Sequence, residues 1–188
     1  MKSAFTLLTS SILLNLSAPP VATPTYPEKT RFLSANEETL RNCCEKMEKD
    51  RRRIFYLNTR KGRMNFQVKG IYTHEETIFF LLLLRNHSYI DFDVDSIRFY
   101  EADRWGKSPI TTPLHSPVHS PIKVLRAVYT FGNTKLIRGK SEELSVIALP
   151  RFTLPEGKRL VIEVTEKNGG RNLHLFADNF TLLRARLI

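Results

Sequence analysis

The sequence predicts a mainly β protein, an immunoglobulin-like β-sandwich preceded by a short leader, a proline-rich linker and one basic helix. Three observations favour this fold class. Short apolar segments alternate with polar residues through most of the chain after residue 54, as in strands with one buried face. Turn residues separate these segments at short intervals, and helical periodicity is evident only before residue 54. The 188 residues are 41% hydrophobic and 26% charged, which excludes a disordered or collagen-like chain.

The leader and linker are expected to occupy residues 1–33. A lysine, an apolar stretch from Ala4 to Ser17 and the small Ala18 resemble a secretory signal, although polar residues interrupt the stretch. The stretch is too short and too polar to span a bilayer stably. Four prolines in residues 18–33 predict an extended linker. Export is the expectation, and a disordered leader or a misplaced start is the alternative.

A basic amphipathic helix is predicted from about Ala35 to Arg52, within a unit spanning residues 34–53. Ser34 precedes Glu37 by three residues, which is the spacing of a capping box. Because both cysteines fall on the apolar face of this helix, we expect them to pack rather than to react. Adjacent cysteines also cannot form an unstrained disulfide. The apolar positions at helical period are Leu40, Cys43, Cys44 and Met47.

The domain spanning residues 54–188 is predicted to contain six to eight short strands and no helix. Residues 64–68 alternate apolar and polar side chains, so one face of this strand is expected to be buried. Residues 78–84 are apolar without interruption, as in a central strand that is covered on both faces. A strand that begins near Ile90 is expected to bury alternate residues until a shift of phase near Ser96 predicts a β-bulge.

The remainder of this domain is predicted to be strands joined by turns. An exposed loop is expected at 103–121, where four prolines occur. Asn168-Gly169-Gly170 predicts a hairpin turn with a positive φ angle. We expect Phe152, between two prolines, to pin a stiff segment to the core. The further strands are expected at 122–131, 144–149, 159–165, 171–177 and 180–187.

Motifs typical of cofactor, metal or catalytic sites are weak in this chain. Asp91, Asp93 and Asp95 have the spacing that starts a calcium loop, but the glycine and glutamate that such a loop needs later are absent. Gly139-Lys140-Ser141 ends a phosphate-loop pattern whose first glycine is replaced by Thr134. We therefore expect an acidic strand face, an ordinary loop, no cofactor and no enzymatic activity.

The excess of basic over acidic residues is the strongest compositional feature and predicts an acidic partner. The net charge is +10, and the segment from residue 41 to residue 63 holds nine basic and three acidic residues, so it contributes +6. Such a cluster could contact the phosphates of a nucleic acid or the acidic surface of a protein. The candidate contact residues are Arg51, Arg52, Arg53, Arg60, Lys61 and Arg63.

Six blocks of residues carry a family resemblance and occur in order over residues 54–188. They are Gly70–Tyr72, Arg85–Tyr100, Ile137–Ser141, Ala148–Pro155, Glu166–Arg171 and Arg184–Arg186. In that order and spacing they resemble the C-terminal β domain of the TraN family of Bacteroidetes conjugative transposons, in a short form. Family members usually have a further β domain ahead of this one, where this chain has the leader, linker and helix. The segment that follows the Phe99-Tyr100 strand also departs from the lysine-rich pattern of the family.

The resemblance implies a non-enzymatic structural or docking subunit of a conjugative transfer apparatus, a type IV secretion system, in the cell envelope. It implies a periplasmic, outer-membrane-associated location, with other subunits of the apparatus and an outer-membrane lipoprotein as partners. Docking through a sheet edge that accepts a partner strand is our mechanistic hypothesis. A basic nucleic-acid-binding accessory protein of conjugation is the alternative function.

Overall fold

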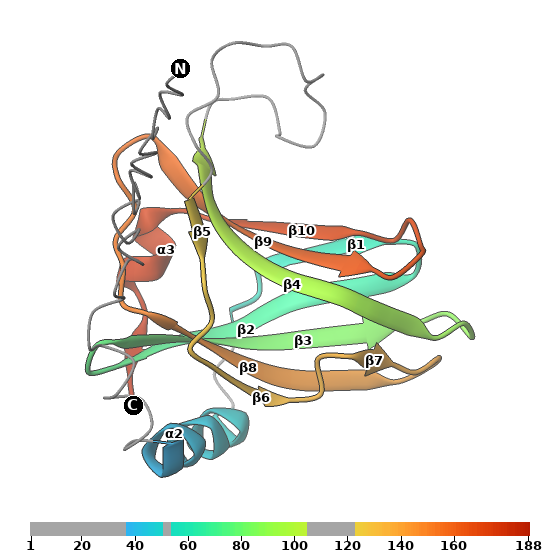
Figure 1. Ribbon diagram of the computed structural model, residues 1–188, viewed down its shortest axis with the longest axis horizontal. Helices are drawn as coiled ribbons and strands as arrows, with labels where there is room; N and C mark the ends of the chain where they lie inside the picture. Colours follow the sequence, from blue (N-terminus) through green and yellow to red (C-terminus); the bar gives the residue numbers. More distant parts are fainter. Residues whose placement is uncertain (1–36, 51–53, 105–122) are drawn as a thin grey trace, which may run out of the picture.

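Two mainly antiparallel sheets packed face to face make up the protein, and a helix covers the outer face of one sheet (Figure 1). The computed structural model describes residues 37–50, 54–104 and 123–188. The β-sandwich predicted from the sequence is confirmed. The predicted leader, linker and most of the predicted proline-rich loop lie outside the described residues.

The strand order is that of an immunoglobulin-like sandwich. One sheet has the order β1 (Asn58–Lys61), β2 (Met64–His74), β3 (Thr77–Asn86), β8 (Glu142–Pro150), β6 (Tyr129–Gly132), with β11 (Arg186–Leu187) parallel to β2. The other has the order β10 (Leu173–Ala177), β9 (Lys158–Glu166), β4 (Phe92–Asp103), β5 (Lys123–Leu125), with β7 (Leu136–Ile137) beside β4. The runs β2-β3-β8-β6 and β10-β9-β4-β5 match strands A-B-E-D and G-F-C-C′ of that fold.

Alternate residues of both sheets meet in the main core. The rings of Phe80 on β3 and Phe99 on β4 lie 5.1 Å apart across the two layers. The predicted bulge in β4 is confirmed between Val94 and Ser96, and it returns Ile97 and Phe99 to the core side after the change of phase. Phe152 packs against the same core, as predicted.

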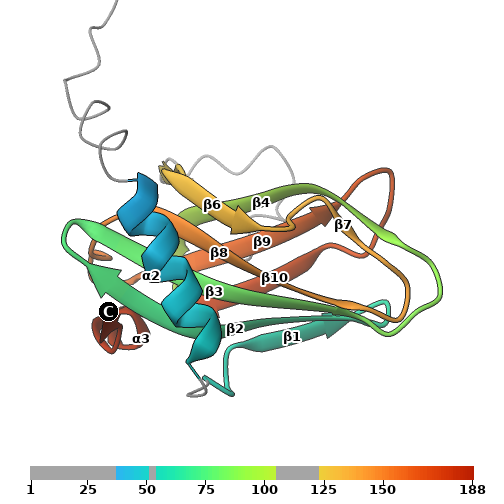
Figure 2. The same ribbon diagram turned by 90° about the horizontal axis from the view of Figure 1, so that it is seen from below.

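Strand β3 is buried on both faces, as its uninterrupted apolar sequence predicts. Phe80 and Leu82 point into the main core, while Phe79 and Leu81 belong to a second apolar cluster on the outer face. Helix α2 (Glu37–Lys49) covers that outer face and crosses the strands of the sheet (Figure 2). The helix contributes the four apolar side chains expected from its periodicity, namely Leu40, Cys43, Cys44 and Met47.

The Cys44 thiol offers a test of this packing. It is fully buried, and burial together with nearby Cys43 raises its pKa to about 12. Because the thiolate is the reactive form, we expect a thiol reagent to modify Cys44 in the native protein at pH 8 at least about a thousandfold more slowly than Cys44 in the unfolded chain. Stopped-flow labelling with and without denaturant measures this ratio. Rapid labelling of native protein would contradict the packing of α2 on the sheet.

Asp50 links the end of α2 to β2 and to the C-terminal strand. The Tyr72 hydroxyl donates a hydrogen bond to Asp50 Oδ2 at 3.0 Å, and Arg186 Nη1 lies 3.3 Å from the same oxygen. Burial and the Asp50 carboxylate raise the pKa of Tyr72. The last residue is held as well, because Ile188 N donates to Thr73 O at 3.2 Å.

The single strand predicted over 122–131 is wrong. The chain forms β5 in one sheet and β6 in the other, and residues 126–128 carry it between the layers. Both strands lie at the edge of their sheets, since β5 pairs with β4 and β6 pairs with β8. Local sequence shows strand propensity on both sides of this crossing, but it does not show that the sheet changes.

The strand predicted over 180–187 is also wrong, as is the absence of a helix from this domain. The short helix α3 (Asn179–Leu183) precedes the two residues of β11. Asp178 caps this helix, because its Oδ1 accepts hydrogen bonds from Thr181 N at 2.8 Å and Thr181 Oγ1 at 2.7 Å. Those hydrogen bonds hold the pKa of Asp178 below its ordinary value. The cap and the burial of Leu182 outweigh the strand propensity of the segment.

Candidate functional site

The structure separates the basic residues that the sequence groups together. Arg60 and Lys61 are exposed on β1, and Arg63 is exposed in the turn that follows. Arg60 lies on the outer face of its sheet, whereas Arg63 lies at one end of the sandwich. Arg51, Arg52 and Arg53 lie outside the described residues.

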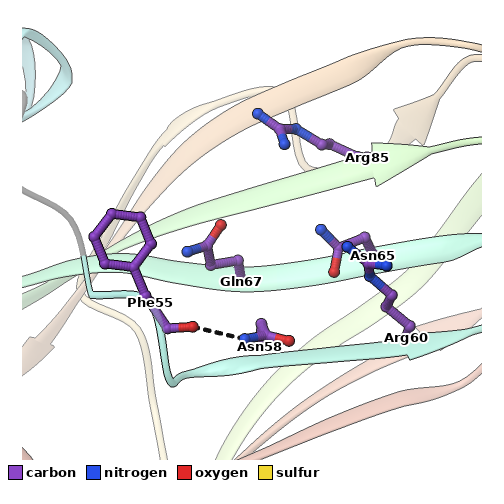
Figure 3. Close-up of a pocket in the computed structure, with 6 residues that line it drawn as sticks. All are labelled: Phe55, Asn58, Arg60, Asn65, Gln67 and Arg85. Carbon is purple, nitrogen blue, oxygen red and sulfur yellow. Dashed lines mark hydrogen bonds between the residues drawn. The ribbon is translucent and has the colours of Figure 1, made fainter.

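Arg60 borders a shallow hollow of about 250 Å³ on the outer face of β1, β2 and β3 (Figure 3). The side chains of three lining residues are bonded within the protein. Asn58 Nδ2 donates to Phe55 O at 2.6 Å, Gln67 Nε2 donates to Ile54 O at 2.8 Å, and Arg85 Nε lies 2.5 Å from Glu142 Oε2. The lining side chains are amides, guanidiniums and one phenyl ring, a set with no nucleophile or general base. The lining residues are Phe55, Asn58, Arg60, Asn65, Gln67 and Arg85.

Four loops meet at the opposite end of the sandwich from α3, at the right of Figure 1. We call this surface the loop platform and define it as residues 62–63, 87–91, 138–141 and 167–171. Backbone hydrogen bonds join the first three loops: His87 N donates to Arg63 O at 2.9 Å, and Lys140 N donates to Ser88 O at 2.9 Å. The platform is therefore one connected surface rather than a set of independent loops.

The buried side chain of Asn86 fixes the loop between β3 and β4 from below. Its Nδ2 donates to Ile90 O at 2.8 Å and to Ile137 O at 3.2 Å. Its Oδ1 accepts from Ser88 N at 3.0 Å and from Ser88 Oγ at 2.6 Å. Asn86 is 2% exposed, and its one side-chain amide thus satisfies polar groups of the β3–β4 loop and of β7.

Arg171 and Glu166 fix the hairpin between β9 and β10 to the same loop. Arg171 Nε donates to Glu166 Oε1 at 2.8 Å, and Arg171 N donates to Oε2 at 3.0 Å. The guanidinium also donates to Ser88 Oγ at 3.2 Å and to Asp91 O at 2.6 Å. The hydrogen bonds from Arg171 hold the pKa of Glu166 below its ordinary value. Asn168, at φ +55°, confirms the predicted turn.

Gly62 lets the β1–β2 turn approach this pair. Its φ angle is +53°, and a Cβ atom at this position would lie 2.6 Å from Cγ of Arg171. A side chain there would strain the backbone and displace the arginine. Glycine is therefore required for the turn and for the close approach of two loops.

The platform displays two large apolar side chains to solvent. Tyr89 is 82% exposed and Ile90 is 72% exposed. The sequence predicts Ile90 as the first buried residue of a strand, but this is wrong because β4 begins at Phe92. The carbonyl of Ile90 bonds to the Asn86 side chain and turns the residue outward. The turn residues Asn86-His87-Ser88 are the sequence signal that could have predicted this exposure.

Three of the six sequence blocks come together at the platform. The blocks Arg85–Tyr100, Ile137–Ser141 and Glu166–Arg171 are far apart in the chain and are joined by the hydrogen bonds described above. The block Gly70–Tyr72 lies instead in β2 beneath α2, and Arg184–Arg186 lies near α3. Spacing in the sequence did not indicate which blocks would be neighbours.

The other motifs considered from the sequence have structural roles in the described residues. Asp91, Asp93 and Asp95 are exposed, and Asp91 Oδ1 accepts a hydrogen bond from Gly139 N at 2.7 Å. Residues 37–50, 54–104 and 123–188 contain no group of three or more histidine, cysteine or acidic side chains placed to hold a metal ion. In the same ranges, no helix has the length and hydrophobicity to cross a membrane.

Comparison with known proteins assigns a family. A family model described as "Domain of unknown function (DUF4138)" matches residues 38–187. No curated protein matches the chain. A solved structure, the archaellum periplasmic stator protein FlaG from Sulfolobus acidocaldarius, aligns with 60% of this chain and 98% of its own at 11% identity and a TM-score of 0.35. Because the model match extends from α2 through both sheets, this chain belongs to the DUF4138 family.

Proposed function

We propose that this protein is a non-enzymatic docking subunit of a conjugative transfer apparatus, a type IV secretion system, in the cell envelope. The resemblance of its six sequence blocks to the TraN family supports the assignment. Its partners in this proposal are other subunits of the apparatus, including an outer-membrane lipoprotein. Its location is the periplasm, in association with the outer membrane.

The loop platform is the observation that carries this proposal. Three blocks of the resemblance meet there, and their polar side chains are used to fix the loops to one another. A surface whose loops are held by hydrogen bonds within the protein and whose apolar side chains face solvent is suited to binding a protein rather than to chemistry. Loops held on a rigid sandwich are also a common position for binding residues.

The platform supports docking better than the sheet edges do. The edge strands β1 and β6 have four residues each, β5 has three and β10 has five. Short edge strands give a partner strand few backbone groups to pair with. We therefore assign docking to the platform in place of the strand-addition mechanism expected from the sequence.

A deletion of the gene in cells that carry the conjugative element tests the proposal. We expect transfer to fall by orders of magnitude, and a tagged copy of the protein to restore it. The tagged copy should fractionate with the envelope and should be isolated together with other element-encoded subunits at moderate salt. Unchanged transfer in the deletion strain would contradict the proposal.

The nucleic-acid alternative predicts a different set of results. A protein that binds the transferred DNA would fractionate with the cytosol and would bind DNA fragments with an affinity that falls steeply as salt is added. Replacing the predicted contact residues Arg60, Lys61 and Arg63 with alanine would then reduce both the binding and the salt dependence. This result would replace the docking function with the alternative.

A further inference from the structure

We propose that the loop platform docks a protein partner by inserting Tyr89 and Ile90 into an apolar pocket that is surrounded by acidic groups. This inference rests on the proposed docking function and deepens it by naming the contact residues and the chemistry of the partner. It goes beyond the family assignment, which gives no binding surface.

Tyr89 and Ile90 form an exposed apolar pair, which we call the knob. Only a binding partner could bury these two side chains. Tyr89 and Ile90 are adjacent and are 82% and 72% exposed, while nearly every other large apolar side chain of the β3–β4 region is buried. Burying apolar side chains of this size is favourable, because their surface is removed from water. Aromatic residues at the centre of an interface frequently dominate its affinity.

The knob is already ordered before a partner binds. The carbonyl of Ile90 is held by Asn86, and the carbonyl of Ser88 by Lys140 N. Asp91 is held at both its carbonyl, by Arg171, and its carboxylate, by Gly139 N. Because these bonds fix the loop on both sides of the knob, docking does not have to order a flexible segment.

The charges around the knob favour an acidic partner. The platform residues include five cations and one carboxylate, Asp91. Arg171 is balanced by Glu166, which leaves four exposed cations with no ion pair among the described residues. Opposite charges on the partner would speed association and fix its orientation. The four are Arg63, Arg138, Lys140 and Lys167.

The same surface fits a protein pocket better than a nucleic acid. Binding of single strands uses aromatic side chains on which successive bases stack. Here the ammonium of Lys140 lies 4.3 Å from the centre of the Tyr89 ring and covers one face of it. Ile90 is aliphatic and offers no stacking surface, so the knob suits an apolar pocket.

The experiment compares two double variants in the deletion strain, using the full chain. Tyr89→Ala/Ile90→Ala removes the knob. Phe180→Ala/Leu183→Ala removes a matched pair on α3 that is 61% and 71% exposed at the other end of the sandwich. The probe is the set of element-encoded envelope subunits that are isolated with wild-type protein and identified by mass spectrometry. Circular dichroism and thermal unfolding check that both variants fold.

We expect the knob variant to recover at least about 30-fold less of one such subunit, as loss of an interface hot spot does, and to reduce transfer. The α3 variant should behave as the wild type. Charge reversal by Arg138→Glu/Lys140→Glu should weaken recovery, whereas Arg41→Glu/Lys46→Glu on the exposed face of α2 should not. The partner identified in this way should present acidic residues at the contact.

Distinct results would overturn the inference without removing the proposed function. A folded knob variant that recovers partners and transfers like the wild type would show that docking uses another surface. Equal losses in the knob and α3 variants would show that neither surface is specific. If sedimentation shows that the wild type dimerises and the knob variant does not, the occupant is a second copy of this chain. Normal transfer in the deletion strain would instead contradict the proposed function itself.

Discussion

Replacing Arg171 with methionine is expected to lower the free energy of unfolding by about 3 kcal/mol at pH 7. The side chain of Arg171 is 18% exposed and that of its partner Glu166 is 9% exposed. Methionine keeps most of the apolar volume but leaves a carboxylate with little access to water and without a counter-ion. It also removes the donors to Ser88 Oγ and Asp91 O, so the loops of the platform lose a shared link. Urea unfolding followed by fluorescence measures the difference.

The same pair predicts how stability depends on pH. Because Arg171 lowers the pKa of Glu166 in the folded state, the pair contributes stability above the ordinary glutamate pKa. That contribution is lost as the pH falls through the folded-state pKa. The difference between the wild type and Arg171→Met should therefore be largest at neutral pH and should shrink below about pH 4.5.

A double variant serves as the control for this prediction. Arg171→Met/Glu166→Gln removes both charges and should recover part of the loss, since no buried carboxylate remains unpaired. Its residual deficit reports the lost hydrogen bonds to Ser88 and Asp91. If Arg171→Met and the double variant are equally unstable at all pH values, the ion pair does not stabilise the platform.

Much of the sandwich could be predicted because its signals are local. The uninterrupted apolar sequence of β3 reflects a strand covered on both faces, by the opposite sheet and by α2. The phase shift at Ser96 and the turn at Asn168 likewise depend on the residues at those positions. In each case the signal depends on residues that are neighbours in the chain, so the sequence alone carries the information.

The errors occur where side-chain hydrogen bonds and tertiary contacts override the strand propensity of a segment. Residues 180–187 have strand-forming side chains, but the cap at Asp178 and the burial of Leu182 produce a helix. Ile90 fits the alternation of the next strand, yet the amide of Asn86 turns it outward. The candidate site depends on four loops that meet only after both sheets form. The clustering of cations along the sequence therefore did not predict which cations share a surface in the folded protein.

Introducing a carboxylate at Met47 by the substitution Met47→Asp is expected to destabilise the protein by about 4 kcal/mol. Met47 lies on α2 and is fully buried against the outer face of the sheet that contains β3. Its neighbours in that cluster are apolar, including Phe79 and Leu81, so an ionised side chain would have little chance of a partner there. The variant loses the packing of the Met47 thioether. In addition, either the new carboxylate is desolvated or α2 detaches from the sheet. Chemical denaturation measures the loss.

The way in which this stability is lost depends on whether α2 unfolds together with the sandwich. If the helix and sheet are one cooperative unit, the denaturation midpoint of Met47→Asp falls and Cys44 is labelled only when the whole protein opens. If the helix detaches alone, Cys44 is labelled rapidly while the sandwich keeps its own transition, and the exposed face around Phe79 binds a hydrophobic dye.

The control Asn42→Asp adds the same charge at an exposed position of α2 and should change stability by less than about 0.5 kcal/mol. An unchanged midpoint together with slow labelling in Met47→Asp would contradict the docking of α2, since a buried carboxylate cannot be without cost in that cluster.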